Sequence, residues 1–294
     1  MFISKFLKTN EKISLSSTYR LHNGVQIPII GFGTWQVKNG EEAYQAVLNA
    51  LKAGYRHIDT AEGYYNEESV GQAIKDSGIP REDIFITTKL TNRHITYEGA
   101  KQAIEDSLKR LGVSYIDLYI IHWPNPTSCR PEYEKRNLAV YQAMEDAYLA
   151  GKFRAIGVSN FHPHHLEALM KHAKIRPMVN QILINPSDMQ PALVAYNEAH
   201  DILTEAYSPF GTGKLFDVDK LKSLSNKYKK STSQILLRWS LQHGYLPLPK
   251  TVTTSRMKEN LEVFDFSLTL EDMQMIDALK GVAGSALNPD TCNF

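Results

Sequence analysis

The chain has 294 residues, which suits one large α/β domain or two average ones. Lys and Arg number 33 against 32 Asp and Glu, so the net charge of +1 provides no positive field for nucleic acid or anionic lipid. No apolar run approaches the roughly 20 residues that span a bilayer, which excludes a membrane protein. The two cysteines, Cys129 and Cys292, have no zinc-ligand spacing and are too few for a disulfide framework. We therefore expect a protein of the reducing cytoplasm without a metal site.

Residues 1–18 carry no turn signal and no strand alternation, and no small-residue cleavage site follows them, so we expect no secretory signal. Four apolar residues of this segment would share one helical face: Phe2, Ile3, Phe6 and Leu7. We interpret the segment as a loosely attached extension, with docking on the body or on a partner as the alternative. Residues 19–294 are expected to form a single domain.

Strand signals begin after the extension. Asn23-Gly24, between two short runs within residues 19–29, predicts a tight β-hairpin. Short runs rich in β-branched and apolar residues then recur, and each predicts a strand. These runs are Ile29–Thr34, Arg56–Asp59, Ile84–Lys89, Ile116–His122, Ala155–Val158, Met178–Ile182, Ile202–Tyr207 and Tyr245–Lys250.

Helical patterns lie between these runs. Apolar residues within 100–111 follow helical spacing, with Thr96 near the start and Gly112 just past the end. Apolar strands that alternate with amphipathic helices indicate parallel strands covered by helices. Although six to nine strands can be counted, eight units in about 250 residues favour a closed (β/α)8 TIM barrel over an open sheet. Two further helical stretches, Val218–Lys229 and Leu270–Lys280, exceed this count and are expected as two extra helices.

Each predicted strand ends in polar or aromatic residues. In a (β/α)8 barrel these ends converge on one mouth, where active sites are built. The residues are Thr34-Trp35, Asp59, Lys89, His122, Ser159-Asn160, Gln181, Tyr207 and Lys250. Taken singly, each has a plain structural reading: an ion pair across the mouth, a core histidine, or a packed aromatic ring. Together these residues indicate an active site at the carboxyl ends of the barrel strands.

At these positions the sequence resembles the aldo-keto reductase family. The stretch Gly54–Glu67 is similar to the family signature that places Asp59 and Tyr64 five residues apart. Further matching segments are Gly31–Trp35, Thr87–Leu90, Ile121–Pro124, Gly157–Phe161, Ala206–Pro209 and Pro249–Thr253. The resemblance covers roughly residues 19–291, and the short loops and tail are similar to the prokaryotic 2,5-diketo-gluconate reductase-like branch. It implies an α/β barrel with an N-terminal hairpin and NADPH-dependent reduction of a small-molecule carbonyl substrate. We expect a monomer.

The resemblance implies four catalytic residues: Asp59, Tyr64, Lys89 and His122. Tyr64 would be the general acid that protonates the carbonyl oxygen. An ammonium near a phenol favours the phenolate, so Lys89 is expected to lower the pKa of Tyr64, and Asp59 would pair with Lys89. His122 would donate a hydrogen bond to the substrate oxygen.

The chain lacks a Rossmann fingerprint, because Gly31-Phe32-Gly33 continues without the third glycine, and Gly211–Lys214 does not match a P-loop. The resemblance therefore implies that the barrel mouth itself holds NADPH. The nicotinamide would stack on Tyr207 and its carboxamide would bind Ser159, Asn160 and Gln181. The pyrophosphate would lie near Ser208, Phe210 and Gly211, the adenine near Glu259 and Asn260, and the 2′-phosphate among Lys250, Thr251, Thr253 and Arg256. The remaining implied cofactor contacts are Gly33, Thr34, Trp35, Asp59, Pro209 and Val252.

Aromatic residues are expected to form the substrate pocket. Trp35, Trp123 and also Tyr65 would supply apolar walls, and Tyr64 and His122 would face the carbonyl. The chain departs from the family pattern after Gln181, where Leu183 and Asn185 replace a usual acid and imidazole. Supporting contacts that relatives make from this strand to the site are therefore not expected here.

Three other functions remain open at this point. The same site would also catalyse alcohol oxidation. A regulatory protein that binds the nucleotide with little turnover is the second alternative, although it has no need of all four catalytic residues. A phosphate-binding barrel isomerase is the third, and it would not bind NADPH.

Overall fold

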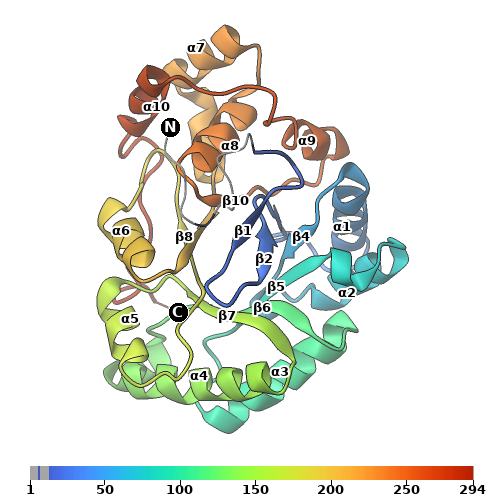
Figure 1. The fold of residues 1–294 in the computed structure, drawn as a ribbon, viewed down its shortest axis with the longest axis vertical. Coiled ribbons are helices and arrows are strands. Elements are labelled where there is room, and N and C mark those ends of the chain that lie inside the picture. The colour runs from blue at the N-terminus through green and yellow to red at the C-terminus, as the bar shows by residue number, and fades with distance from the viewer. Residues whose placement is uncertain (1–5, 7–12, 294) are drawn as a thin grey trace.

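The computed structural model describes residue 6 and residues 13–293, and it forms a (β/α)8 barrel (Figure 1). Eight parallel strands follow one another around the barrel in chain order. They are β3 (Phe32–Gly33), β4 (His57–Asp59), β5 (Phe85–Leu90), β6 (Ile116–Ile121), β7 (Phe153–Ser159), β8 (Val179–Leu183), β9 (Leu203–Tyr207) and β10 (Leu246–Leu248). The barrel is closed between its first and last strands, because Gly31 N donates to Pro247 O at 3.1 Å and Gly33 N donates to Pro249 O at 3.0 Å. The predicted eight strands and closed barrel are confirmed.

The N-terminal hairpin covers the amino end of the barrel. Strands β1 (Thr18–Arg20) and β2 (Gln26–Pro28) pair in antiparallel fashion around Gly24, whose φ of 91° is one that glycine adopts without strain. The Tyr19 hydroxyl donates to the carbonyl of Tyr245, directly before β10, at 3.1 Å. The amino end is therefore closed, and the mouth at the carboxyl ends of the strands stays accessible.

The N-terminal extension meets the body at Phe6. The Phe6 side chain is buried in the main core, and its carbonyl accepts a hydrogen bond from Arg20 N at 2.8 Å. The docked alternative therefore holds at this residue, contrary to the expected loose attachment, because an apolar ring finds core contacts there. The other members of the predicted helical face, Phe2, Ile3 and Leu7, lie outside the described residues. The hairpin also begins at Thr18, one residue before the predicted domain boundary.

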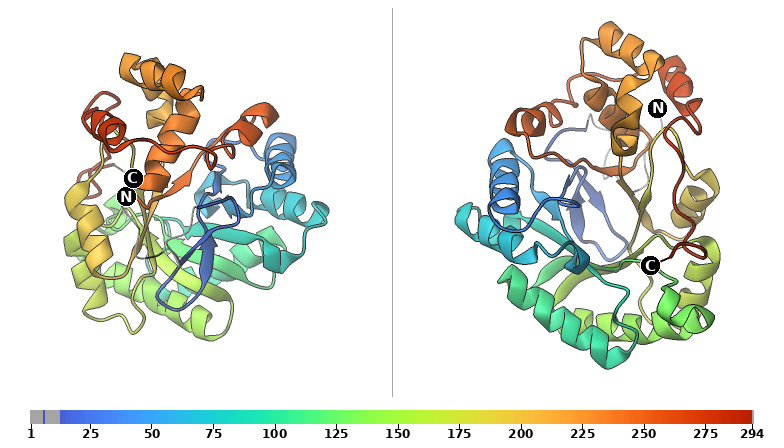
Figure 2. Two further views of the ribbon diagram at one scale, coloured as in Figure 1. Left: turned by 45° about the horizontal axis from the view of Figure 1, so that its top comes forward. Right: turned by 180° about the vertical axis from the view of Figure 1, so that it is seen from behind.

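Helices surround the barrel (Figures 1 and 2). The outer ring consists of α1 (Glu41–Ala53), α2 (Glu67–Asp76), α3 (Tyr97–Leu111), α4 (Tyr133–Leu149), α5 (Pro163–Met170), α6 (Pro191–Ala199), α8 (Thr232–Gln242) and α9 (Thr254–Glu259). As predicted, α3 begins after Thr96, whose hydroxyl accepts from Gly99 N, and ends at Gly112 in a left-handed conformation. The two extra helices are α7 (Asp219–Tyr228) and α10 (Leu270–Asp277), which confirms both predicted decorations. Within the described residues, no helix combines the length and apolar character needed to cross a membrane.

Glycine permits close packing of α2 against α3. A Cβ atom built on Gly71 of α2 would overlap the Leu111 carbonyl at the end of α3, at 2.6 Å from its carbon. Backbone atoms cannot move aside as a flexible side chain does, so only a residue without Cβ fits here.

We expect Gly71→Ala to lower the free energy of unfolding by about 1–3 kcal/mol, because overpacking outweighs the gain of about 1 kcal/mol that alanine brings to a helix. Urea titration followed by circular dichroism measures this change. Glu68→Ala, at an exposed position of the same helix, is the matched control. A stabilised Gly71→Ala variant would contradict the close contact.

Candidate active site

A cavity of about 800 Å³ opens at the carboxyl ends of the strands. Most of the predicted site residues line it: Gly33, Trp35, Asp59, Tyr64, His122, Trp123, Ser159, Asn160, Gln181, Tyr207, Ser208, Pro209, Phe210 and Lys250. They come from the ends of seven of the eight strands and the following loops, as expected for a barrel mouth, and β5 is the strand that contributes none.

The other predicted residues lie outside the lining of this cavity: Thr34, Lys89, Gly211, Thr251, Val252, Thr253, Arg256, Glu259 and Asn260. Thr34 is buried behind the mouth and donates from Oγ1 to the Asp59 carbonyl at 2.9 Å. Thr253 and Arg256 are exposed at α9, which follows Lys250 closely in the chain. Tyr65, expected as a pocket wall, is 68% exposed and also lies outside the lining.

A buried ion pair lies at the base of the mouth. Lys89 Nζ contacts Asp59 Oδ1 at 2.6 Å and donates to the Thr60 carbonyl at 2.8 Å. Both side chains are almost fully buried, and adjacent parallel strands β4 and β5 position them. A buried ammonium is tolerated only with such partners, so the pair holds a fixed charge arrangement next to the cavity.

Tyr64 lies beside this pair. Lys89 Nζ is 4.9 Å from the centroid of its ring, and Tyr64 ends the short 3-10 helix Glu62–Tyr64 that follows β4. Burial, and secondly the Asp59 carboxylate, raise the pKa of Tyr64 well above its usual value. The expected lowering by Lys89 is therefore not found, because burial disfavours the charged phenolate and the Asp59 carboxylate adds to this effect. The phenol keeps its proton throughout the neutral range.

His122 completes the group. Its ring lies edge-on to Tyr64, with 5.7 Å between the ring centroids. Burial and the Lys89 ammonium lower the pKa of His122 to about 3. The imidazole is therefore neutral at physiological pH, so it can donate a hydrogen bond to a substrate oxygen without bringing a second cation into the mouth.

A second set of polar groups lies on β7, β8 and β9. The Tyr207 hydroxyl donates to Asn160 Oδ1 at 2.8 Å, and Asn160 Nδ2 donates to the His122 carbonyl at 3.0 Å. Gln181 Nε2 donates to Asp59 Oδ2 and to Glu205 Oε2, both at 2.8 Å. With both amide hydrogens used, Gln181 presents Oε1 as an acceptor, which suits the NH2 group of a carboxamide.

Glu205 was not predicted from the sequence. It is completely buried on β9, beside Gln181 in the sheet register, and connects to the catalytic pair through that amide. Burial, and secondly the Asp59 carboxylate, raise its pKa to about 8. His57 Nε2 lies 3.6 Å from Glu205 Oε1, but burial and Lys89 lower the His57 pKa to about 3, so the two meet as neutral groups at pH 7. The only sequence signal was a charged residue inside the predicted strand Ile202–Tyr207.

The two departures from the family pattern have separate positions. Leu183 lines the cavity and adds apolar surface to its wall. Asn185 is buried and donates from Nδ2 to the Ser208 carbonyl at 3.1 Å, while its Oδ1 accepts from Ser187 N. Asn185 therefore holds the loop that carries Ser208, a cavity residue.

The fold and this mouth define an enzyme of the (β/α)8-barrel class with proton-transfer groups at the carboxyl ends of its strands. A family model described as the Aldo/keto reductase family matches residues 29–280. The chain is 46% identical to glyoxal reductase from Bacillus subtilis (strain 168), over 96% of this chain and 99% of that protein. It is 40% identical to methylglyoxal reductase DkgA from Escherichia coli (strain K12), over 94% and 97%. The crystal structure of Bombyx mori aldo-keto reductase AKR2E4 in complex with NADP matches with a TM-score of 0.83 at 39% identity, over 92% of this chain and 94% of that one.

The chain therefore belongs to the aldo/keto reductase family and is an oxidoreductase. This confirms the family resemblance stated from the motifs.

The buried Glu205 carboxyl makes stability depend on pH. Its pKa is raised in the folded state, so its contribution is complete below the unfolded value of about 4.5 and is lost as pH rises towards 8. We expect the difference in unfolding free energy between wild type and Glu205→Gln to fall by up to about 1.4 kcal/mol per pH unit across this window. Urea unfolding at pH 5, 6, 7 and 8 measures it, with the exposed Glu82→Gln as control. A pH-independent difference would show that Glu205 is ionised in the native protein.

Proposed function

We propose that this protein is an NADPH-dependent reductase of small aldehydes and ketones, with Tyr64 as its general acid. The observation that carries the proposal is the buried Asp59–Lys89 pair beside Tyr64 and a neutral His122 at the wall of the cavity. The names of the relatives, glyoxal reductase and methylglyoxal reductase, make small dicarbonyl compounds the first substrates to test. The protein is proposed to act as a monomer.

The residues present fit a nicotinamide cofactor. Tyr207 offers a ring at the cavity wall, and its hydroxyl is held by Asn160. Gln181 Oε1 is positioned as an acceptor for the carboxamide. Lys250 and Arg256, near each other in the chain and both exposed, form no ion pair within the described residues, so they are available for a 2′-phosphate.

When bound, NADPH supplies the hydride to the carbonyl carbon. His122, neutral in the mouth, orients the substrate by a hydrogen bond to the carbonyl oxygen. Tyr64 donates its phenolic proton to that oxygen as negative charge develops there. The Lys89 ammonium, held by Asp59, stabilises the resulting phenolate, since it lies close to the ring. Trp35 and Trp123 contribute apolar surface to the same cavity.

Tyr64→Phe removes the proposed proton donor and leaves the ring in place. We expect kcat for glyoxal reduction to fall by at least about 100-fold, the usual effect of losing a positioned general acid, while the Kd for NADPH is unchanged. Steady-state NADPH oxidation and fluorescence titration measure the two quantities. Tyr65→Phe, at the adjacent exposed position, is the matched control.

The raised pKa of Tyr64 also determines the pH dependence. Because the phenol stays protonated below a raised pKa, the wild-type kcat should not decline between pH 6 and 9 through loss of this proton.

Near wild-type turnover of the Tyr64→Phe variant would show that another group supplies the proton.

Arg256 provides the test of cofactor choice. Charge-assisted hydrogen bonds to a phosphate are worth about 1.5–3 kcal/mol, so Arg256→Ala should weaken NADPH binding by roughly 10- to 100-fold and leave NADH binding unchanged. Fluorescence titration of both cofactors measures this selectivity, and Lys258→Ala, exposed on the same helix, is the control. Equal losses for NADPH and NADH would show that Arg256 supports the loop and does not recognise the 2′-phosphate.

A further inference from the structure

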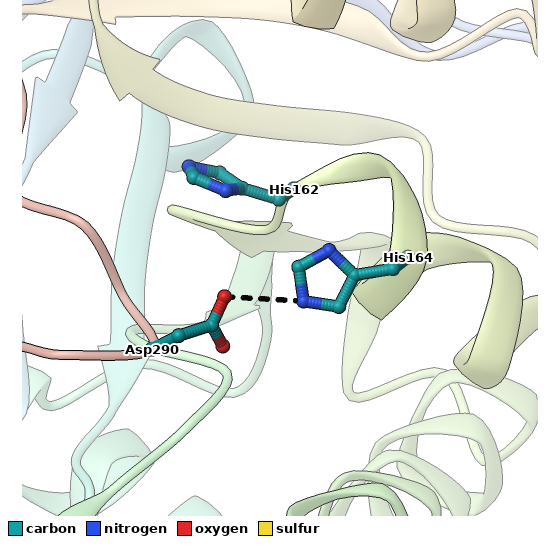
Figure 3. A group of neighbouring side chains, drawn as sticks. All are labelled: His162, His164 and Asp290. Atoms are coloured by element: carbon teal, nitrogen blue, oxygen red, sulfur yellow. Dashed lines mark ion pairs between the residues drawn. The ribbon is translucent and has the colours of Figure 1, made fainter.

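Three side chains with metal-ligating atoms meet where the C-terminal segment contacts the start of α5. Figure 3 shows His162 and His164, two residues apart in the chain, facing Asp290. One ligand atom from each lies within 4.8 Å of the others, and His164 Nε2 is 3.2 Å from Asp290 Oδ2. This group lies outside the lining of the active-site cavity.

The surrounding residues hold the Asp290 carboxylate in a defined orientation. Its Oδ1 accepts from Asn125 Nδ2 at 2.9 Å and from the fully buried His165 Nε2 at 2.8 Å. His165 Nδ1 accepts from the backbone N–H of His162 at 3.1 Å, and this assigns the proton of His165 to Nε2. Oδ1 is therefore occupied by donors, while Oδ2 faces His164. Metal-binding carboxylates are commonly oriented by such outer hydrogen bonds.

We propose that His162, His164 and Asp290 form a binding site for a divalent metal ion of borderline softness, with Zn²⁺ as the best fit. Two imidazole nitrogens and one carboxylate oxygen are a usual ligand set for Zn²⁺, with water in the fourth position. Bond lengths of about 2.0–2.1 Å in a tetrahedron separate ligand atoms by about 3.3 Å. The His164–Asp290 pair already has this spacing. The two remaining distances both involve His162, which is only partly buried, so a rotation of its side chain would close them.

A metal ion here joins the C-terminal segment to the barrel. Asp290 lies three residues after Leu287, which lines the active-site cavity together with Ser285. The same segment is anchored by Ala286 N, which donates to Asp188 Oδ2 at 2.9 Å. The bound ion therefore adds a cross-link at the end of a segment that forms part of the cavity wall. No metal site was expected from the sequence, because the aspartate lies 126 residues from His164 in the chain.

Isothermal titration calorimetry with ZnCl2 tests the site on the full-length protein, freed of metal by EDTA and dialysed at pH 7.5. We expect one saturable site per chain in the wild type. His164→Ala and Asp290→Asn should abolish Zn²⁺ binding. Asn125→Ala should weaken the Zn²⁺ affinity by about 10- to 100-fold, because Asn125 orients the Asp290 carboxylate without binding the metal itself. His172 is an exposed histidine shortly after α5, outside the cluster. The control variant His172→Ala should therefore bind Zn²⁺ as the wild type does.

Thermal unfolding with and without ZnCl2 provides the second measurement. A metal that binds the folded state raises Tm with concentration in the wild type and not in His164→Ala. His164 is exposed, so this variant should have the wild-type Tm in EDTA, which separates loss of the site from loss of folding even if Asp290→Asn loosens the tail. Absence of saturable binding in the wild type, or unchanged binding in His164→Ala, would overturn the proposal.

Discussion

The active-site mouth depends on one buried contact, the ion pair between Lys89 and Asp59. An ammonium in a low-dielectric interior is tolerated only when a carboxylate and further acceptors surround it, and here Asp59 and the Thr60 carbonyl do so. The register of β4 and β5 determines that these two side chains meet. Burial, and secondly the Lys89 ammonium, lower the pKa of His122, and the same ammonium lies against the ring of Tyr64. Burial is the larger cause of both pKa shifts, and the charges of this pair add to it at Tyr64 and His122.

A polar network continues from the pair into the barrel. Gln181 connects Asp59 to Glu205, and Glu205 lies next to His57. Burial, and secondly the neighbouring Asp59 carboxylate, raise the pKa of Glu205 to about 8, so the Glu205 carboxyl is protonated at neutral pH. Within this network, Lys89 and Asp59 form the ion pair, and Glu205 adds no second negative charge. It also leaves the Gln181 amide with a defined orientation towards the cavity.

The N-terminal hairpin with Phe6 and the C-terminal segment pack against opposite ends of the barrel. Phe6 and the hairpin cover the amino end, where Tyr19 bonds to the backbone before β10. The C-terminal segment contributes Ser285 and Leu287 to the cavity lining, and its Asp290 is bonded to His165 of α5. Asn125, His165 and Asp290 hold it there through hydrogen bonds. The hairpin therefore covers one end of the barrel and the C-terminal segment forms part of the cavity wall at the other end, and the repeating β/α units provide neither.

The sequence by itself determined the repeating architecture and the members of the proposed catalytic group. The alternation of apolar runs with helical spacing is local, so it predicted the eight strands, α3 with its Thr96 cap, and the two extra helices. The residues at strand ends, such as Asp59, Lys89 and His122, could be assigned to one mouth because parallel strands bring their carboxyl ends together. The pKa values of the site residues could not be predicted from the sequence in this way. The raised pKa of Tyr64 and the protonation of Glu205 depend on burial and on charges from other strands, and the His162–His164–Asp290 cluster depends on where the tail docks. Those distances and degrees of burial exist only after the chain has folded, so the tertiary structure alone decided them.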